Sequence, residues 1–286
     1  MPKCTQTPPV GRARTFERTR IGQVDMKKRD GWFAVYRPVR HPALRLFCFP
    51  FAGGGSLAYR DWPDHLPPEV EVRGVQLPGR ESRFKERPYT RLADLVQDLA
   101  DTFTAHTSLP YAFFGHSMGA LVAFALAREL RRRHQPGPEL LMVSACRGPQ
   151  LRDPDPPIHG LPELDFLEEI RKLNGTPEAV LGNQELLQLL IPLLRADFEV
   201  CETYEYLEEK PLACPIVAFG GTEDPDLPRE DIAAWSHETA GSFTLRMFPG
   251  DHFYLLDQPA ALMRQVSTHL TGCLDQPPAA ATAPRP

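Results

Sequence analysis

Residues 113–127 read FFGHSMGALVAFALA and place one serine, Ser117, between two glycines. The segment from Gly115 to Gly119 fits the pattern G-x-S-x-G, with an apolar run before it and a helical pattern after it. A serine on a sharp strand-to-helix turn is strained, and side chains at the two flanking positions would clash with the neighbouring strand and helix. The pattern predicts a nucleophile at Ser117. The alternative is a tight turn whose serine has no chemical role.

A base must accept the proton of such a serine before its hydroxyl can attack, and an acid must orient that base. The histidines that follow Ser117 in the chain are His134, His159, His237, His252 and His269. His252 lies in the loop segment PGDHFYLL that follows the apolar run FTLRMF, whereas the others lie in a basic helix end, a proline-rich loop or helical stretches. We therefore expect His252 to be the base.

The acid is expected between the serine and the histidine along the chain. Asp224 follows the apolar run CPIVAFGG, and a carboxylate at the carboxyl end of a parallel strand faces the same rim as the serine turn. Pro225 favours an extended backbone at Asp224. Asp197, in LLRADFEVCETY, is the alternative acid, and we favour Asp224.

Backbone N–H groups must stabilise the oxyanion of a tetrahedral intermediate. One donor is expected from Met118, the residue after the nucleophile. The other is expected from the glycine-rich segment FPFAGGGS, where Ala52 is the favoured donor and Phe51 the alternative. The segment lacks the GK[ST] sequence of a phosphate-binding loop.

Short apolar runs alternate with helical patterns along the part of the chain that must position these residues. Strands are expected over 44–51, 71–77, 111–115, 139–145, 214–221 and 243–250. Helices are expected over 92–103, 120–133 and 260–274. This alternation predicts an α/β fold with a mostly parallel central sheet and helices on both faces. The strands are continuously apolar, which indicates burial on both faces of the sheet.

A segment of about sixty residues, roughly 153–210, interrupts this alternation and is far longer than an ordinary connection. It contains helical patterns over 162–175 and 183–207, and Pro192 in the second is expected to bend that helix. We expect a helical lid insertion above the sheet. A pair of additional packing helices is the alternative.

The composition is that of a globular protein, with 286 residues, 42% hydrophobic residues and a net charge of -5. This charge gives no reason to expect nucleic acid or a membrane as partner. No apolar run reaches the roughly 18 residues of a membrane span, and the N-terminus lacks the apolar region of a signal peptide. We expect a cytoplasmic protein.

The two ends of the chain differ in composition from the region between them. Residues 1–28 are polar and basic and are expected to be a disordered extension, with Met26 as an alternative start; residues 274–286 are expected to be a disordered Pro/Ala tail. The folded domain is then expected over 29–273. The six cysteines are scattered with no CxxC pair, so we expect free thiols and no metal site.

Several motifs together resemble one enzyme family. They are FCFPFAGGGSLAYRDW, VQLPGRESRF, PYAFFGHSMGALVAFALARELR, FGGTEDP and FPGDHFYL, in this order. They resemble the type II thioesterases, discrete α/β-hydrolase enzymes that accompany polyketide and nonribosomal peptide synthetases. The segments VQLPGRESR and FPFAGG are not required by hydrolase chemistry in general. The resemblance covers about residues 32–256 and implies an α/β-hydrolase fold with Ser117, Asp224 and His252 as its triad, and with the amides of Ala52 and Met118 as its oxyanion donors.

The resemblance also implies a substrate, an acyl group in thioester linkage to the phosphopantetheine arm of an acyl or peptidyl carrier protein. The implied role is the removal of aberrant or stalled acyl groups. The alternatives are a medium-chain thioesterase that releases fatty acids, a small-molecule carboxylesterase, and a noncatalytic scaffold that binds carrier proteins. No cofactor of the enzyme's own is expected, since the substrate carries the phosphopantetheine, and a monomer is expected.

Two further groups of residues receive a role from the resemblance. The residues expected to contact the acyl group, with plain packing as the alternative, are Phe51, Leu190, Leu194, Phe253 and Tyr254. The basic residues expected to contact an acidic carrier are Arg80, Arg83, Lys85 and Arg87, with a second cluster, Arg131 to Arg133, that is better explained as solvated surface charge.

Overall fold

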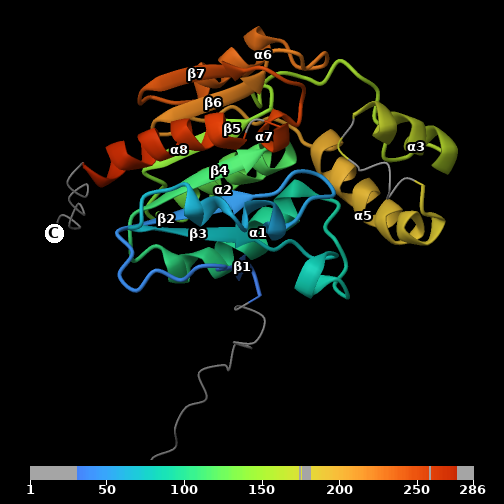
Figure 1. Cartoon of the computed structure of the whole chain (residues 1–286). Helices are drawn as coiled ribbons and strands as arrows, with labels where there is room; N and C mark the ends of the chain where they lie inside the picture. The colour runs from blue at the N-terminus through green and yellow to red at the C-terminus, as the bar shows by residue number, and fades with distance from the viewer. Residues whose placement is uncertain (1–30, 174, 176–181, 258, 276–286) are drawn as a thin grey trace, which may run out of the picture.

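A computed structural model of the protein describes residues 31–173, 175, 182–257 and 259–275 (Figure 1). Its strands form one seven-stranded sheet with the order β1-β3-β2-β4-β5-β6-β7. They are β1 (Phe33–Ala34), β2 (Leu44–Phe49), β3 (Val70–Val75), β4 (Tyr111–His116), β5 (Leu140–Ser144), β6 (Ile216–Gly221) and β7 (Phe243–Phe248). All neighbouring strands are parallel except β1 and β3. The predicted α/β fold with a mostly parallel sheet is confirmed.

Helices surround this sheet, and the C-terminal helix crosses in front of the strands in Figure 1. They are α1 (Leu92–Phe103), α2 (Met118–Arg132), α3 (Glu163–Lys172), α5 (Gln184–Glu202), α6 (Arg229–Ala233), α7 (Tyr254–Asp257) and α8 (Pro259–Leu274). The helix expected over 120–133 begins two residues earlier, and the helix expected over 183–207 ends at Glu202. Among the helices that the structure describes, none has the length and apolar character to cross a membrane.

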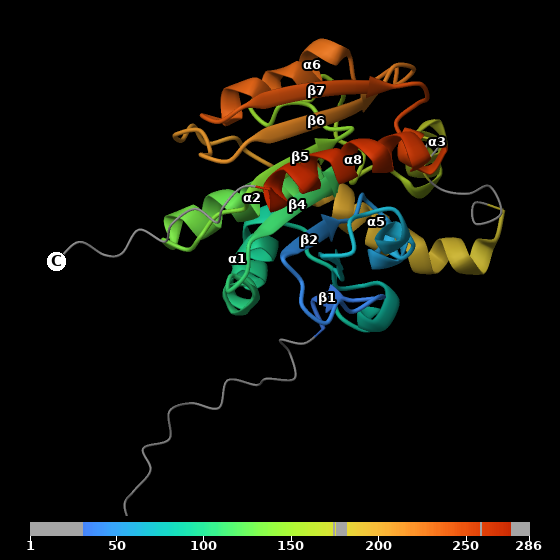
Figure 2. The ribbon, with the colours of Figure 1, turned by 60° about the vertical axis from the view of Figure 1, so that its left-hand side comes forward.

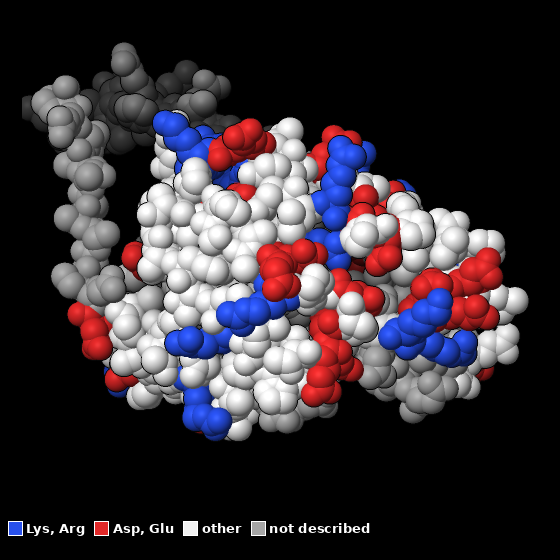
Figure 3. All heavy atoms as spheres, turned by 90° about the horizontal axis from the view of Figure 1, so that it is seen from above, with Lys and Arg blue, Asp and Glu red and all other residues white. Residues whose placement is uncertain are grey.

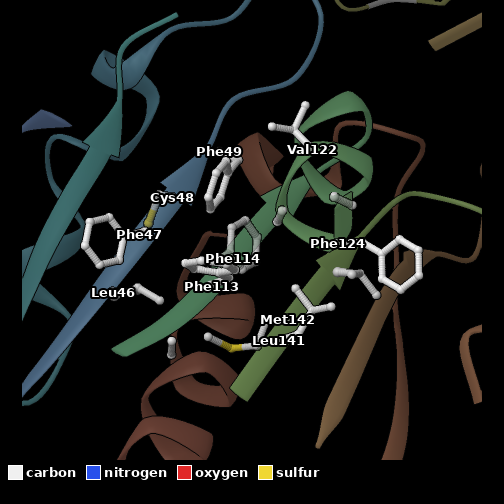
Figure 4. Packing of buried hydrophobic residues seen from close by; sticks show 14 of the residues in the cluster. Leu46, Phe47, Cys48, Phe49, Phe113, Phe114, Val122, Phe124, Leu141 and Met142 are labelled. Carbon is white, nitrogen blue, oxygen red and sulfur yellow. The ribbon is translucent and has the colours of Figure 1, made fainter. Parts of the chain in front are cut away.

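The centre of the sheet forms the hydrophobic core, where Figure 4 shows side chains of β2, β4, β5 and α2 packed together. Every residue of β4 is buried. The rings of Phe47 and Phe113 meet edge to face at 6.1 Å, and Phe103 of α1 lies 5.3 Å from Phe113. Burial of one such side chain contributes about 2–3 kcal/mol. This packing fixes the end of β4, from which Ser117 projects.

The edges of the sheet differ from the sequence-based prediction. The two-residue strand β1, antiparallel to β3, was not predicted. In β7 only Phe248 is buried, because β7 is an edge strand paired with β6. Burial on both faces was therefore a wrong prediction for β7, and it holds for the central strands.

The helices α3 and α5 stand beyond the carboxyl ends of the strands, as Figures 1 and 2 both show. They share an apolar cluster separate from the main core, made of Phe166, Leu167, Ile170, Leu187, Ile191 and Leu194. The Asn183 side chain caps α5 by accepting from the backbone N–H groups of Glu185 and Leu186. The predicted helical insertion is present, with residues 174 and 176–181 of it outside the described residues. This insertion, with α3 and α5, is called the lid below, and its role as a lid rather than as packing helices stays a prediction.

The predicted extension 1–28 lies outside the described residues, as does the predicted tail from residue 276 onward. Helix α8 continues to Leu274, one residue past the predicted end of the domain. The cysteines that the structure describes, Cys48, Cys146, Cys201, Cys214 and Cys273, are free thiols.

Candidate active site

Ser117 occupies the turn between β4 and α2, as the G-x-S-x-G pattern predicts. Its backbone has φ 53° and ψ −121°, a combination that residues other than glycine rarely adopt. The strain is maintained by the flanking elements, since the Ser117 N–H donates to the Ser144 carbonyl of β5 at 2.8 Å. The turn therefore holds the serine at the carboxyl edge of the sheet.

The two glycines of the motif are required because there is no space for a side chain. A Cβ on Gly115 would lie 2.2 Å from the carbonyl oxygen of Gly119. A Cβ on Gly119 would lie 2.1 Å from the carbonyl oxygen of Phe49, at the end of β2. The predicted clashes with the helix and the neighbouring strand are thus confirmed.

The structure brings His252 and Asp224 together. The Nδ1 atom of His252, in the loop after β7, lies 2.7 Å from Oδ2 of Asp224, in the loop after β6. The Asp224 side chain is 1% exposed, and its Oδ1 accepts from the Asp226 N–H at 3.2 Å. The His252 ring lies 5.4 Å from the ring of His116, which places it beside the serine turn.

Asp197, the alternative acid, has other partners. It lies on α5, where its two carboxylate oxygens accept from the guanidinium of Arg80 at 2.7 and 2.8 Å. Its Oδ2 also accepts from the Gly53 N–H at 2.8 Å. The geometry pairs His252 with Asp224 and gives Asp197 a different place in the site.

Both expected oxyanion donors lie next to the serine turn. Met118 begins α2, so its N–H is among those that have no acceptor within the helix. Ala52 lies in a turn directly after β2, which pairs with β4 so that Phe49 is opposite Gly115. The Gly54 N–H closes this turn by donating to the Phe51 carbonyl at 2.9 Å. Parallel pairing thus brings the two donors to the same edge of the sheet.

His116 was missed by the sequence analysis because it occupies an unspecified position of the motif. Its ring is fully buried, and Nδ1 lies 2.9 Å from the hydroxyl of Ser144, which lies 2.5 Å from that of Tyr254. Burial first, and then the neighbouring charge of His252, hold the pKa of His116 well below its usual value. His116 is therefore a neutral imidazole beneath the site.

Tyr254 was expected on the wall of the substrate pocket, and this expectation is corrected. Its side chain is fully buried, stacks on Phe248 at 5.3 Å and bonds to Ser144 through its hydroxyl. Burial raises the pKa of this hydroxyl. Tyr254 packs in the core, which was the stated alternative.

The other expected substrate contacts are divided between the site and the lid. The rings of Phe51 and Phe253 meet edge to face at 5.2 Å, and Phe253 lies 5.1 Å from the His252 ring. A Cβ on Gly175 of the lid would lie 2.4 Å from Phe253. The aromatic pair therefore lies between His252 and the lid.

The two lid leucines lie farther along α5. Leu194 is buried against the turn that follows β2, residues 51–54, since a Cβ on Gly53 would lie 2.6 Å from its Cδ2 atom. Leu190 is half-buried and packs against the apolar cluster of α3 and α5.

The predicted basic contact surface is corrected in part. Arg80 is buried by its pairing with Asp197, and Arg83 is buried over the ring of Trp32, 4.1 Å from the ring centre. Lys85 and Arg87 are exposed.

The second basic cluster, Arg131 to Arg133, forms ion pairs with Glu209, Glu129 and Asp101. It lies at the end of α2 opposite Ser117.

Comparison with known proteins decides the family. Residues 44–270 match the family model described as the Thioesterase domain. The chain belongs to this family. It is a serine hydrolase of the thioesterase type with an α/β-hydrolase fold, and the resemblance to type II thioesterases is confirmed.

The relatives of this thioesterase cover nearly the whole described domain. Gramicidin S biosynthesis protein GrsT of Aneurinibacillus migulanus is 43% identical over 226 residues, which are 79% of this chain and 88% of the relative. Thioesterase PikA5 of Streptomyces venezuelae is 41% identical over 245 residues, 84% of this chain and 85% of the relative. The solved structure of the type II thioesterase BorB from the borrelidin biosynthetic cluster matches with a TM-score of 0.77 at 38% identity, covering 84% of this chain and 98% of that one.

Proposed function

We propose that this thioesterase hydrolyses acyl thioesters on the phosphopantetheine arm of acyl or peptidyl carrier proteins, and so removes aberrant or stalled acyl groups in polyketide or nonribosomal peptide biosynthesis. The 2.7 Å contact of His252 with Asp224, beside the strained turn of Ser117, carries the proposal. The relatives named for gramicidin S and borrelidin biosynthesis support the choice of pathway.

The reaction proceeds in two steps. His252 Nε2 accepts the proton of Ser117 as Oγ attacks the thioester carbonyl carbon, and the N–H groups of Ala52 and Met118 stabilise the oxyanion. The C–S bond breaks and the departing thiolate takes the proton from His252, which leaves an acyl-serine. His252 then takes a proton from a water molecule, which attacks the acyl-serine ester. The ester C–O bond breaks, His252 donates this proton to the Ser117 oxygen, and the carboxylic acid is released. Asp224 holds the Nδ1–H of His252, so that Nε2 is free to accept.

The substrate supplies the phosphopantetheine, so the proposed reaction uses no cofactor of the enzyme's own. Phe51 and Phe253 are proposed to contact the acyl group near the carbonyl, because their rings lie between His252 and the lid. Leu190 and Leu194 are proposed to contact its distal part from α5.

The exposed residues Phe84, Lys85 and Arg87, after β3, are the proposed carrier contacts, with Phe84 55% exposed. The face seen in Figure 3 mixes basic and acidic side chains and offers no broad basic surface for an acidic partner. The double change Lys85→Glu with Arg87→Glu should raise KM for an acyl-carrier substrate about tenfold and leave KM for a small acyl thioester unchanged. The exposed Arg264→Glu on α8 is the matched control, and equal effects on both substrates would refute the docking role.

The function is tested by loading carrier proteins with acetyl, propionyl and longer acyl groups and following hydrolysis by intact-mass spectrometry. We expect loss of the acyl mass with the wild type and not with Ser117→Ala. A strong preference for medium chains would favour the fatty-acid alternative, and faster hydrolysis of simple esters would favour a carboxylesterase. A fluorophosphonate that fails to label Ser117 would support the noncatalytic scaffold.

A further inference from the structure

A buried ion pair lies beside the oxyanion turn, residues 51–54. Arg80 and Asp197 are 6% and 3% exposed, and two hydrogen bonds of 2.7 and 2.8 Å join the guanidinium to the carboxylate. Removal of two charges from water is unfavourable, and apolar replacements of buried pairs are often at least as stable. The pair therefore needs an explanation other than fold stability.

Both members of the pair also bind the backbone of the turn. Asp197 Oδ2 accepts from the Gly53 N–H at 2.8 Å, and Arg80 Nη1 donates to the Gly54 carbonyl at 2.8 Å. The turn itself is closed by the bond from the Gly54 N–H to the Phe51 carbonyl. The ion pair therefore adds two hydrogen bonds to the backbone of the turn beyond its own closing bond.

These contacts select one form of the turn. Gly53, at the third position, has φ +75°, which belongs to a type II turn and not to the commoner type I. The two forms differ by a flip of the central peptide, the one whose N–H belongs to Gly53. Because Asp197 accepts that N–H, it favours the type II form.

The direction of the Ala52 N–H is set by the closing bond of the turn, and the contacts of Asp197 and Arg80 with Gly53 and Gly54 help to keep that turn in place. The Ala52 N–H and the Phe51 carbonyl belong to the same peptide, so the closing bond that Phe51 accepts fixes where the Ala52 N–H points. The second donor is close by, since Met118 lines the same small cavity as Arg80 and Asp197. The ion pair thus bonds to the turn that contains Ala52 and shares a cavity with Met118.

We propose that Asp197 and Arg80 are positioning residues for the oxyanion hole, which act by holding the turn that carries the Ala52 N–H. This inference rests on the proposed function. It also makes the second half of α5 part of the active site, because Leu194, one turn before Asp197, packs against the same Gly53. The motif VQLPGRESR then acts on catalysis from the interior, through Arg80.

The test compares three variants with a small acyl thioester as substrate. Asp197→Leu removes the acceptor of the Gly53 N–H, and Arg80→Met with Asp197→Leu removes both charges, so that no unpaired charge is left in the interior. We expect kcat to fall about 100-fold in both, with KM within about threefold of wild type, because an oxyanion donor acts on the transition state. Asp197→Asn keeps an oxygen for Gly53 and should recover about tenfold of the loss.

An alkyl boronic acid gives a second readout, since its tetrahedral adduct with serine places an oxygen in the oxyanion hole. Its Kd should rise by the same factor as kcat falls. The control is Glu71→Gln, a buried carboxylate paired with Arg73 away from the turn, which should lower Tm without changing kcat.

The inference is overturned if the folded double variant keeps kcat within twofold of wild type, or if kcat falls with Tm in the control as well. Ser117→Ala separates this outcome from failure of the proposed function. If Ser117→Ala retains activity, the proposed function fails; if it is inactive while the Asp197 variants are fully active, only the positioning role fails.

Discussion

Replacing Asp224 by asparagine tests the assignment of the acid with almost no change of shape. In the structure each carboxylate oxygen accepts one N–H, Oδ2 from His252 and Oδ1 from Asp226. Asparagine has one oxygen and one NH2 group, so one of these two donors would face another donor. If the NH2 group faces His252, the ring must carry its proton on Nε2, where it cannot accept the proton of Ser117.

The size of the effect follows from the geometry. Asp224 is 1% exposed and stands 2.7 Å from Nδ1, so its charge acts on the imidazolium with little screening by water. Two opposite charges about 4 Å apart interact by about 4 kcal/mol at an effective dielectric constant near 20. Loss of that energy from the transition state lowers kcat about 10³-fold, and the wrong tautomer brings the loss toward about 10⁴-fold.

The assay is steady-state hydrolysis of a small acyl thioester, with release of the thiol followed by a thiol-reactive dye. Asp224→Asn should lower kcat by this factor with little change in KM, and the exposed neighbour Glu223→Gln should behave as the wild type. Activity of Asp224→Asn within tenfold of the wild type would refute the assignment. Loss of activity on substitution of Asp197 but not of Asp224 would instead assign the acid to Asp197.

Three other changes follow from the same structure. Gly119→Ala places a Cβ 2.1 Å from the Phe49 carbonyl oxygen and should destabilise the fold by about 3 kcal/mol or more in thermal unfolding, whereas Gly137→Ala, with open space around it, should not. Burial lowers the pKa of His116, so below about pH 6.5 the unfolded chain binds a proton that the folded chain does not. Lowering the pH below this value should therefore decrease the free energy of unfolding by up to about 1.4 kcal/mol per pH unit. Urea titrations between pH 5 and 8 should show a smaller slope for His116→Gln, and an unchanged slope would contradict this account. Phe253→Ala should lower kcat/KM for an octanoyl thioester about tenfold more than for an acetyl thioester, and an equal loss for both would exclude an acyl contact.

Local patterns in the sequence were sufficient to predict the central strands, the serine turn and the histidine that follows β7. These predictions rest on short-range signals: a continuous apolar run, a glycine two positions before and two positions after Ser117, and a histidine in the loop that follows a strand. The strand β1 has two residues and therefore no pattern to read.

The environment of charged residues could not be predicted in the same way. Arg80 and Arg83 look like exposed residues in a polar segment, yet Arg80 is buried by a partner 117 positions away. His116 of β4 and Tyr254 of α7 are joined through Ser144 of β5, and no local spacing reveals such a contact. The sequence analysis offered Asp197 only as the alternative acid, and the fold shows instead that its carboxylate accepts from the Gly53 N–H in the turn after β2.

The central claim is that Ser117 carries the acyl group during hydrolysis of a carrier-bound thioester. Its most direct test is to mix the enzyme with an acyl-carrier protein, quench within milliseconds and measure the mass of the enzyme. The account predicts a gain of one acyl group, located on the peptide that contains Ser117, and neither gain nor hydrolysis with Ser117→Ala. Hydrolysis by Ser117→Ala at the wild-type rate, or an acyl group on another residue, would contradict it.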